Sequence, residues 1–256
     1  MTLELQDVRK RFGGVVASDG VTFRVGDGEI FGLIGPNGAG KTTAVNLITA
    51  YMRPDSGQIR FEDTEITRLK PRQLAARGVS RTFQSLRLFE GVTVADNVLI
   101  GRHRWFEGHV LLPFLGGKFE KSQRAAALKW VDFVGLGDVA AEPVDSLPYG
   151  LRRKVEIARA LALEPRLLLL DEPTAGMTRT ESDEVAGLIR RIREHGITVL
   201  LIDHNISLVN QVCDRVAVLD FGKVIAEDEP KAIWQNQLVR RAYLGDDEET
   251  MTGADS

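Results

Sequence analysis

Short apolar segments alternate with longer amphipathic segments along most of the chain. Strands are predicted where apolar residues alternate or run without interruption, over residues 2–8, 20–34, 57–62, 166–170, 197–202, 215–219 and 222–227. Apolar residues at helical spacing predict helices over residues 43–51, 71–77, 93–104, 120–134, 151–163, 180–194 and 205–212. Because strands and helices alternate, the sequence predicts an α/β fold with a mainly parallel core sheet.

The region from about residue 85 to residue 151 differs from its surroundings because its pattern is mostly helical. A piece broken by Gly and Pro, residues 107–118, separates two of its predicted helices. We therefore predict a helical subdomain inserted into a core formed by residues 1–84 and 152–245. The last residues, 246–256, are acidic and rich in small side chains, and we expect them to be disordered.

Composition and charge narrow the class of protein only in part. A chain of 256 residues forms one large domain or two small ones, and its net charge of −3 gives no case for nucleic-acid binding through bulk electrostatics. Cys213 is the only cysteine, which rules out an intrachain disulfide and fits a reducing cytosol. No apolar run approaches the ~20 residues of a membrane-spanning helix, and the N-terminus lacks the pattern of a signal peptide. Any work at a membrane is therefore expected from the cytoplasmic side, through a partner.

A glycine-rich segment, residues 35–42, fits the pattern G-x-x-x-x-G-K-[ST] between a predicted strand and a predicted helix. Glycines let the backbone approach phosphates closely, and backbone N–H groups at a helix N-terminus favour an anion. Lys41 is expected to reach the β- and γ-phosphates, and Thr42 to ligate Mg²⁺. A chance match in a turn is the alternative, which the flanking elements disfavour. The predicted nucleotide-binding residues are Gly35, Pro36, Asn37, Gly38, Ala39, Gly40, Lys41, Thr42 and Thr43.

Two adjacent carboxylates, Asp171 and Glu172, follow a run of four leucines, residues 167–170. Such a run is typical of a strand buried on both faces, and α/β sheets bind ligands at the C-terminal ends of their strands. One carboxylate is placed to hold Mg²⁺ through water while its neighbour polarises an attacking water. In isolation a solvated turn is the commoner interpretation, but the phosphate loop in the same chain favours the functional one.

The phosphate loop and the acidic pair resemble those of the ATPase subunits of ABC transporters, and the resemblance covers residues 1–245. It implies a single ABC-type nucleotide-binding domain, in which an antiparallel β part and a helical subdomain join the parallel core sheet. It also implies Mg²⁺-dependent ATP hydrolysis, with Asp171 on the metal side and Glu172 as the general base for water.

Three further positions match family residues that contact the nucleotide. Gln84 resembles the loop glutamine that reaches Mg²⁺ and water, and His204 resembles the histidine that contacts the γ-phosphate. Phe12 resembles the aromatic residue that stacks on adenine. Each also has a plainer interpretation, namely a surface glutamine, a satisfied structural histidine and a core phenylalanine. Their order around one phosphate loop favours the functional interpretation.

The family signature, usually L-S-G-G-Q, corresponds here to residues 147–151, Leu-Pro-Tyr-Gly-Leu. Pro148 lacks both the hydroxyl and the N–H that a serine would offer the γ-phosphate of a facing subunit. Tyr149 and Gly150 are still expected to contact that nucleotide, because a helix N-terminus points at its phosphates. The basic residues 152–154 are expected to form a solvated helix face.

The family sandwiches each ATP between two subunits, so the resemblance implies a dimer, formed with a second copy or with a similar ATPase. Thr178 departs from the Asp or Asn often found at that interface. The dimer is expected to drive integral-membrane permease subunits from the inner face of the cell membrane, and indirectly to serve a solute-binding protein. The permease is expected to dock near Gln84, and Arg87, Leu88 and Phe89 are candidate contacts, although ordinary core or loop positions are their plainer interpretation.

A set of local features, including residues 81–89, the Tyr-Gly signature and residues 241–245, resembles ATPases that power branched-chain amino-acid importers, whose relatives carry urea or other small solutes. The alternative within the family is the ATPase that extracts lipopolysaccharide, which is expected to have proline in place of Phe83 and an intact signature. A hypothesis of another class is a non-transport ATP switch, but no second phosphate loop or coiled coil is visible. A degenerate subunit that binds ATP without hydrolysing it is disfavoured by the intact residues Lys41, Asp171, Glu172 and His204.

Overall fold

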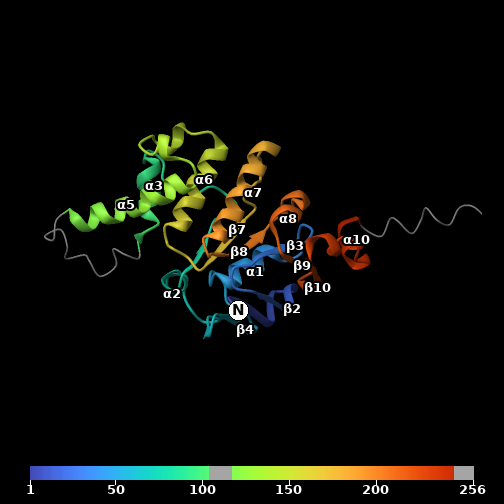
Figure 1. Ribbon diagram of the computed structural model, residues 1–256. Coiled ribbons are helices and arrows are strands. Elements are labelled where there is room, and N and C mark those ends of the chain that lie inside the picture. Colours follow the sequence, from blue (N-terminus) through green and yellow to red (C-terminus); the bar gives the residue numbers. More distant parts are fainter. Residues whose placement is uncertain (104–116, 245–256) are drawn as a thin grey trace, which may run out of the picture. The chain divides into compact units, whose positions relative to one another are not determined.

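The computed structural model (Figure 1) describes residues 1–103 and 117–244. These residues form two compact units. The first unit comprises Met1–Pro71 with the segment that starts at Thr198, and the second comprises Arg72–Ile197. Residues 107–116 of the predicted broken piece and the predicted disordered tail, 246–256, lie outside the described residues. Within the described ranges, no helix combines the length and the apolar character needed to cross a bilayer.

The N-terminal half of the first unit is a four-stranded antiparallel sheet in the order β2-β1-β4-β5. Its strands are β1 (Leu3–Phe12), β2 (Val15–Val25), β4 (Ser56–Phe61) and β5 (Thr64–Glu65). In β1, Leu3, Leu5 and Val8 are fully buried. The strand continues past the predicted end at residue 8, because register shifts around Asp7, which has φ 46°, interrupt the alternation without ending the pairing.

The second sheet of this unit runs in the order β10-β9-β3-β8. Its strands are β3 (Ile30–Ile34), β8 (Thr198–Ile202), β9 (Arg215–Asp220) and β10 (Lys223–Asp228). β3 is central and parallel to both β8 and β9, and every residue of β3 and β8 is buried. The predicted parallel core therefore places the end of β3, where the phosphate loop begins, beside the ends of β8 and β9.

Four helices belong to the first unit, within the residues described: α1 (Lys41–Ile48), α8 (Ile206–Val212), α9 (Pro230–Ile233) and α10 (Gln237–Leu244). The first two match predicted helices, although α1 begins two residues earlier than predicted. The last two were not predicted. Helix α9 has only four residues, which is too few to show a helical period.

The second unit contains the parallel strand pair β6 (Val79–Arg81) and β7 (Leu167–Asp171). Its helical elements are α2 (Pro71–Ala76), which begins at the unit boundary, α3 (Val94–Ile100), α5 (Lys118–Phe133), η2 (Gly137–Val139), η3 (Val144–Ser146), α6 (Tyr149–Leu161) and α7 (Arg179–Glu194). Helices α3, α5 and α6 pack together (Figure 1) around buried side chains such as Val98, Val131 and Val155. The short strand β6 was not predicted.

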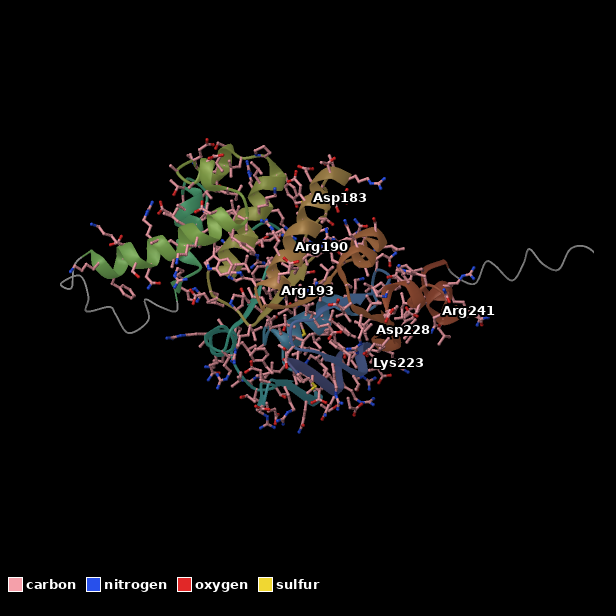
Figure 2. The ribbon with its side chains drawn as sticks, viewed as in Figure 1. Asp183, Arg190, Arg193, Lys223, Asp228 and Arg241 are labelled. Carbon is pink, nitrogen blue, oxygen red and sulfur yellow. The ribbon has the colours of Figure 1, made fainter. Side chains whose placement is uncertain are left out.

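Helix α7 shows why helical spacing was readable in this sequence. Val185, Ile189 and Ile192 form its buried stripe, while charged side chains such as Asp183 and Arg190 project from the same helix (Figure 2). The predicted range, residues 180–194, differs from the observed helix by one residue. Strands and helices together confirm the predicted α/β class, with parallel and antiparallel parts.

Candidate nucleotide-binding and hydrolytic site

The phosphate loop follows β3 and turns sharply back into α1. Gly35 has φ 149°, and a Cβ there would lie 2.1 Å from the carbonyl oxygen of Leu219. Gly40 has φ 104°, and a Cβ there would lie 2.5 Å from the carbonyl oxygen of Ala17. No real side chain tolerates such distances, so glycine is required at both positions. The pattern that predicted this loop is thus explained by its close approach to β9 and β2.

The N-terminus of α1 is arranged to favour an anion. Its N-cap residue, Gly40, provides no side-chain acceptor, and its first turn contains no acidic residue. The Nζ atom of Lys41 donates to the carbonyl oxygens of Gly35 and Pro36, at 2.6 and 2.8 Å. Lys41 therefore holds its ammonium group at the loop itself, at the positive end of the helix dipole, and Thr42 follows as an exposed residue.

His204 lies in the first unit at the same sheet edge as the phosphate loop. Leu33 pairs in parallel with Ile202, so the residues after both strands emerge side by side. The buried carboxylate of Asp203 accepts a hydrogen bond of 2.8 Å from the N–H of Asn205. This turn leaves the imidazole of His204 60% exposed, with its Nδ1 atom 3.9 Å from Asp203 Oδ1. The exposed ring fits contact with a ligand better than a buried structural role.

Phe12 ends β1 and its side chain is 46% exposed, so its interpretation as a core residue is wrong. The ammonium group of Lys10 lies 5.6 Å from the ring centroid. Asp55 anchors this strand end, because its two oxygens accept from Lys10 Nζ at 2.7 Å and from the N–H of Arg11 at 2.8 Å. These bonds, that of Lys10 foremost, lower the pKa of Asp55. The sequence pattern does not indicate this role of Asp55, because Asp55 lies 45 residues from Lys10.

In the second unit, Asp171 is the last residue of β7, one position beyond the predicted end of the strand at residue 170. Its carboxylate pairs with the guanidinium of Arg81 at 2.8 Å, and both side chains are only 9% exposed. The N–H of Asp171 donates to the hydroxyl of Thr82, and the N–H of Thr82 donates to the carbonyl of Leu169. The segment after β6 therefore fixes the end of β7, a role for Arg81 and Thr82 that the sequence pattern did not reveal.

Glu172 adopts a left-handed backbone conformation, with φ 45°. For a residue other than glycine this conformation costs about 1–2 kcal/mol, and the following residue, Pro173, further disfavours helical conformations at this position. The side-chain amide of Gln84 donates to Glu172 Oε2 at 2.9 Å. The structure thus brings together two predicted catalytic residues and holds one of them in a strained turn, as is common at functional sites.

The basic residues 152–154 do not form the solvated face that was expected. Arg153 is 1% exposed and donates to main-chain carbonyl groups of β7 and the segment after it. Arg152 donates to the carbonyls of Asp145 and Leu147. Lys154 pairs with the exposed carboxylate of Glu184 at 2.6 Å. The sequence pattern does not indicate the burial of Arg153, because the main-chain carbonyls that it binds come from segments distant in the chain.

The predicted signature lies at the start of α6, with Pro148 as its N-cap residue and Tyr149 45% exposed. A Cβ on Gly150 would lie 2.7 Å from Glu181 Oε1, so glycine makes room for the start of α7.

Thr178 forms a capping box with Glu181 at the start of α7. The hydroxyl of Thr178 accepts from the N–H of Glu181, and the carboxylate of Glu181 accepts from the N–H of Thr178. The hydrogen bonds that this carboxylate accepts from the N–H and the hydroxyl of Thr178 lower the pKa of Glu181. The residue that departs from the family pattern thus has a clear structural role.

The chain is similar to known proteins over nearly its full length. A family model described as ABC transporter matches residues 18–175. The chain is 40% identical to the high-affinity branched-chain amino acid transport ATP-binding protein BraF of Pseudomonas aeruginosa, covering 95% of this chain and 98% of BraF. It is 37% identical to the lipopolysaccharide export system ATP-binding protein LptB of Acidithiobacillus ferridurans, covering 95% and 97%.

Two solved structures share the fold. The ADP conformation of MJ1267, an ATP-binding cassette of an ABC transporter, matches with a TM-score of 0.85 and 30% identity, covering 95% of this chain and 98% of that one. A dimeric post-hydrolysis state of the ATP-binding cassette MJ0796, bound to ADP and Pi, matches with a TM-score of 0.75 and 25% identity, covering 89% and 98%.

Proposed function

This chain belongs to the ABC transporter family and is an ATPase with that family's fold, and from this premise we propose that it powers a membrane permease that imports branched-chain or related hydrophobic amino acids. The observation that carries the proposal is the 40% identity to BraF over almost the full length of both chains. The import of a similar small solute such as urea fits the same reasoning.

Export of lipopolysaccharide is the second candidate, because the identity to LptB is only slightly lower, at 37%. Two local features favour the importer. Phe83 stands before the loop glutamine, and the signature reads Pro148-Tyr-Gly. The exporter is expected to differ from this chain at both of these positions.

We propose that residues 1–245 act as one ATPase domain, with residues 1–84 and 152–245 as its core and residues 85–151 as its helical subdomain. In this domain Phe12 stacks on adenine, and residues 35–43, which include Lys41, bind the phosphates. The exposed ring of Phe12 and the uncapped N-terminus of α1 support these roles.

Mg²⁺ fits the residues assigned to it, since a hydroxyl from Thr42, an amide oxygen from Gln84 and a carboxylate from Asp171 are hard oxygen ligands. When bound with ATP, the ion neutralises charge on the β- and γ-phosphates. Arg81 supports this assignment because it keeps the carboxylate of Asp171 in one orientation.

We assign Glu172 as the general base. It accepts a proton from a water molecule while the water oxygen attacks the γ-phosphorus and the bond to the β,γ-bridging oxygen breaks. Gln84 orients Glu172 and the water, and Lys41 and His204 stabilise negative charge on the γ-phosphoryl oxygens. The hydrogen bond of 2.9 Å between Gln84 and Glu172 supports this pairing of roles.

The active form is a dimer, of two copies or of this chain with a similar ATPase. The exposed Tyr149 and the adjacent Gly150, at the start of α6, contact the nucleotide held by the other subunit. The dimeric form of MJ0796 supports this arrangement. ATP favours the closed dimer and hydrolysis reopens it, which supplies the differential binding that shifts a permease between two states.

The permease docks at the inner face of the membrane, against a groove in the second unit. This groove has a volume of about 310 Å³ and is lined in part by Phe83, Arg87, Phe89 and Arg159. Leu88 lies between two exposed side chains, of which Phe89 is 50% exposed. An apolar face with cationic side chains suits a cytoplasmic helix of a membrane protein.

The proposal is tested by affinity purification of this chain from its native membranes in mild detergent, with mass spectrometry of the retained proteins. Two distinct permeases with a second ATPase are expected, and the associated solute-binding protein is then screened against branched-chain amino acids. Recovery of a lipopolysaccharide-export permease pair with this ATPase alone would assign the exporter function. Recovery of no membrane protein would favour a non-transport ATP switch.

A further inference from the structure

Arg153 is the largest fully buried side chain in the residues that the structure describes. All three of its guanidinium nitrogens donate. Nη2 donates to the carbonyl oxygens of Asp171 and Glu172 at 2.6 and 2.8 Å, and Nε donates to that of Pro173 at 3.3 Å. One side chain of α6 therefore binds three consecutive main-chain carbonyls of the turn that carries the proposed general base.

The remaining nitrogen of Arg153 connects this turn to the segment before Gln84. Nη1 donates to the carbonyl oxygen of Phe83 at 2.5 Å and to Glu156 Oε2 at 2.5 Å. Glu156 Oε1 in turn accepts from the N–H of Phe83 at 3.2 Å. Both main-chain groups of Phe83, the residue directly before Gln84, are thus bound by the buried Arg153–Glu156 pair.

The pair lies one helical turn apart on α6, which begins at the predicted signature. Burial raises the pKa of Glu156, while the charge of Arg153 opposes that shift. A buried ion pair is weak support for stability in itself, because apolar residues of similar volume often replace such pairs without loss. Its many bonds to two functional loops point to positioning instead.

We propose that Arg153, supported by Glu156, is a positioning residue for ATP hydrolysis. It fixes the strained backbone of Glu172 and the backbone of Phe83, and so keeps the side chains of Glu172 and Gln84 within hydrogen-bonding distance. It also makes the orientation of the general base depend on the position of α6, the helix that carries the signature. This inference rests on the proposed role of Glu172 as the general base.

The test compares three variants of the full chain: Arg153→Met, the double variant Arg153→Met with Glu156→Gln, and Arg153→Lys. The single Met variant leaves the buried charge of Glu156 without its ion-pair partner, and the double variant removes that charge. Lys keeps the charge but cannot reach every acceptor of the guanidinium fork. Lys154→Met is the matched control, since it removes a basic side chain from the same helix without touching either loop.

For each variant the kcat of ATP hydrolysis, the Kd for ATP and the melting temperature are measured. We expect kcat to fall about 10- to 100-fold in all three Arg153 variants, because misplacement of a catalytic group by about 1 Å has effects of this size. The Kd for ATP is expected to stay unchanged. In the double variant the melting temperature is expected to recover while kcat stays low.

Two outcomes would overturn this inference without contradicting the proposed general base. One is a wild-type kcat in the Arg153 variants, and the other is a kcat in the double variant that recovers together with the melting temperature. Either would assign the pair a purely structural role. Glu172→Gln is measured in parallel. If that variant hydrolyses ATP normally, the proposed general base is wrong and the inference fails with it, whereas its inactivity leaves the Arg153 variants as an independent test.

Discussion

The side-chain amide of Gln84 donates a hydrogen bond of 2.9 Å to the carboxylate of Glu172, a residue 88 positions later in the chain. Gln84 lies in the segment after β6, and Glu172 comes directly after β7. The strands β6 and β7 pair in parallel. The two side chains meet because parallel strands end at the same edge of a sheet. This relationship gives the proposed general base an orienting partner within the same unit.

Glu172→Gln tests the general base directly. The amide cannot accept a proton from water, so ATP turnover is expected to fall at least 100-fold, while ATP binding persists and closed dimers accumulate. Phosphate release and size-exclusion chromatography with ATP measure both effects. Glu184→Gln, at an exposed carboxylate that pairs with Lys154, serves as the control and is expected to hydrolyse ATP normally. Near-normal turnover in Glu172→Gln would remove Glu172 from the role of base.

Lys41→Ala tests the phosphate loop. The variant loses a charged hydrogen-bond donor worth about 1.5–3 kcal/mol, so the Kd for ATP is expected to rise about 10- to 100-fold. Isothermal titration calorimetry with ATP and Mg²⁺ measures the change. Lys223→Ala is a suitable control, because its ammonium pairs with Asp19 at 3.3 Å on an exposed surface. Unchanged affinity in Lys41→Ala would contradict the assignment of the loop.

Thr178→Ala tests the structural role found for a residue that departs from the family pattern. Loss of the capping box is expected to lower the free energy of unfolding by about 1 kcal/mol, measured by chemical denaturation. Thr178→Ser retains the hydroxyl and is expected to keep wild-type stability. Thr180→Ala, two residues further on and exposed, is the matched control. Equal stability of Thr178→Ala and wild type would show that the cap contributes nothing.

Asp55 predicts a dependence of stability on acidic pH. Its bonds to Lys10 and to the N–H of Arg11 hold its pKa in the folded chain below the ordinary value of 3.8. The unfolded chain therefore binds the proton more tightly, so this contribution to stability is present above about pH 4 and is lost as the pH falls through the folded pKa.

The free energy of unfolding of wild type and Asp55→Asn is compared in a series of buffers from neutral to strongly acidic pH. The difference between them is expected to be constant above about pH 4 and to shrink below it. Asp63→Asn, at another aspartate of the same unit, is expected to change this profile little. A difference that stays constant down to the lowest pH would contradict the role of Asp55.

Local patterns predicted most of the secondary structure and the positions of the candidate phosphate loop and acidic pair. The phosphate loop was readable because its glycines, Lys41 and Thr42 are consecutive and lie between a strand and a helix. The strand before Asp171 was readable from four leucines. By contrast, β5, β6 and α9 have two to four residues each and are too short to show a period. Strand β1 continues beyond its alternating residues because of register shifts near Asp7.

The sequence by itself determined the class of fold, the phosphate loop and the identity of the acidic pair, because each depends on neighbours in the chain. Only the tertiary structure decided which side chains meet. Arg153 is one of three adjacent basic residues in the sequence, yet it is buried because β7 and the segment after β6 bring main-chain carbonyls to its guanidinium group. Asp55 likewise gains its role from β1. Burial and hydrogen bonding between distant segments depend on how the strands pair, and local periodicity does not specify that pairing.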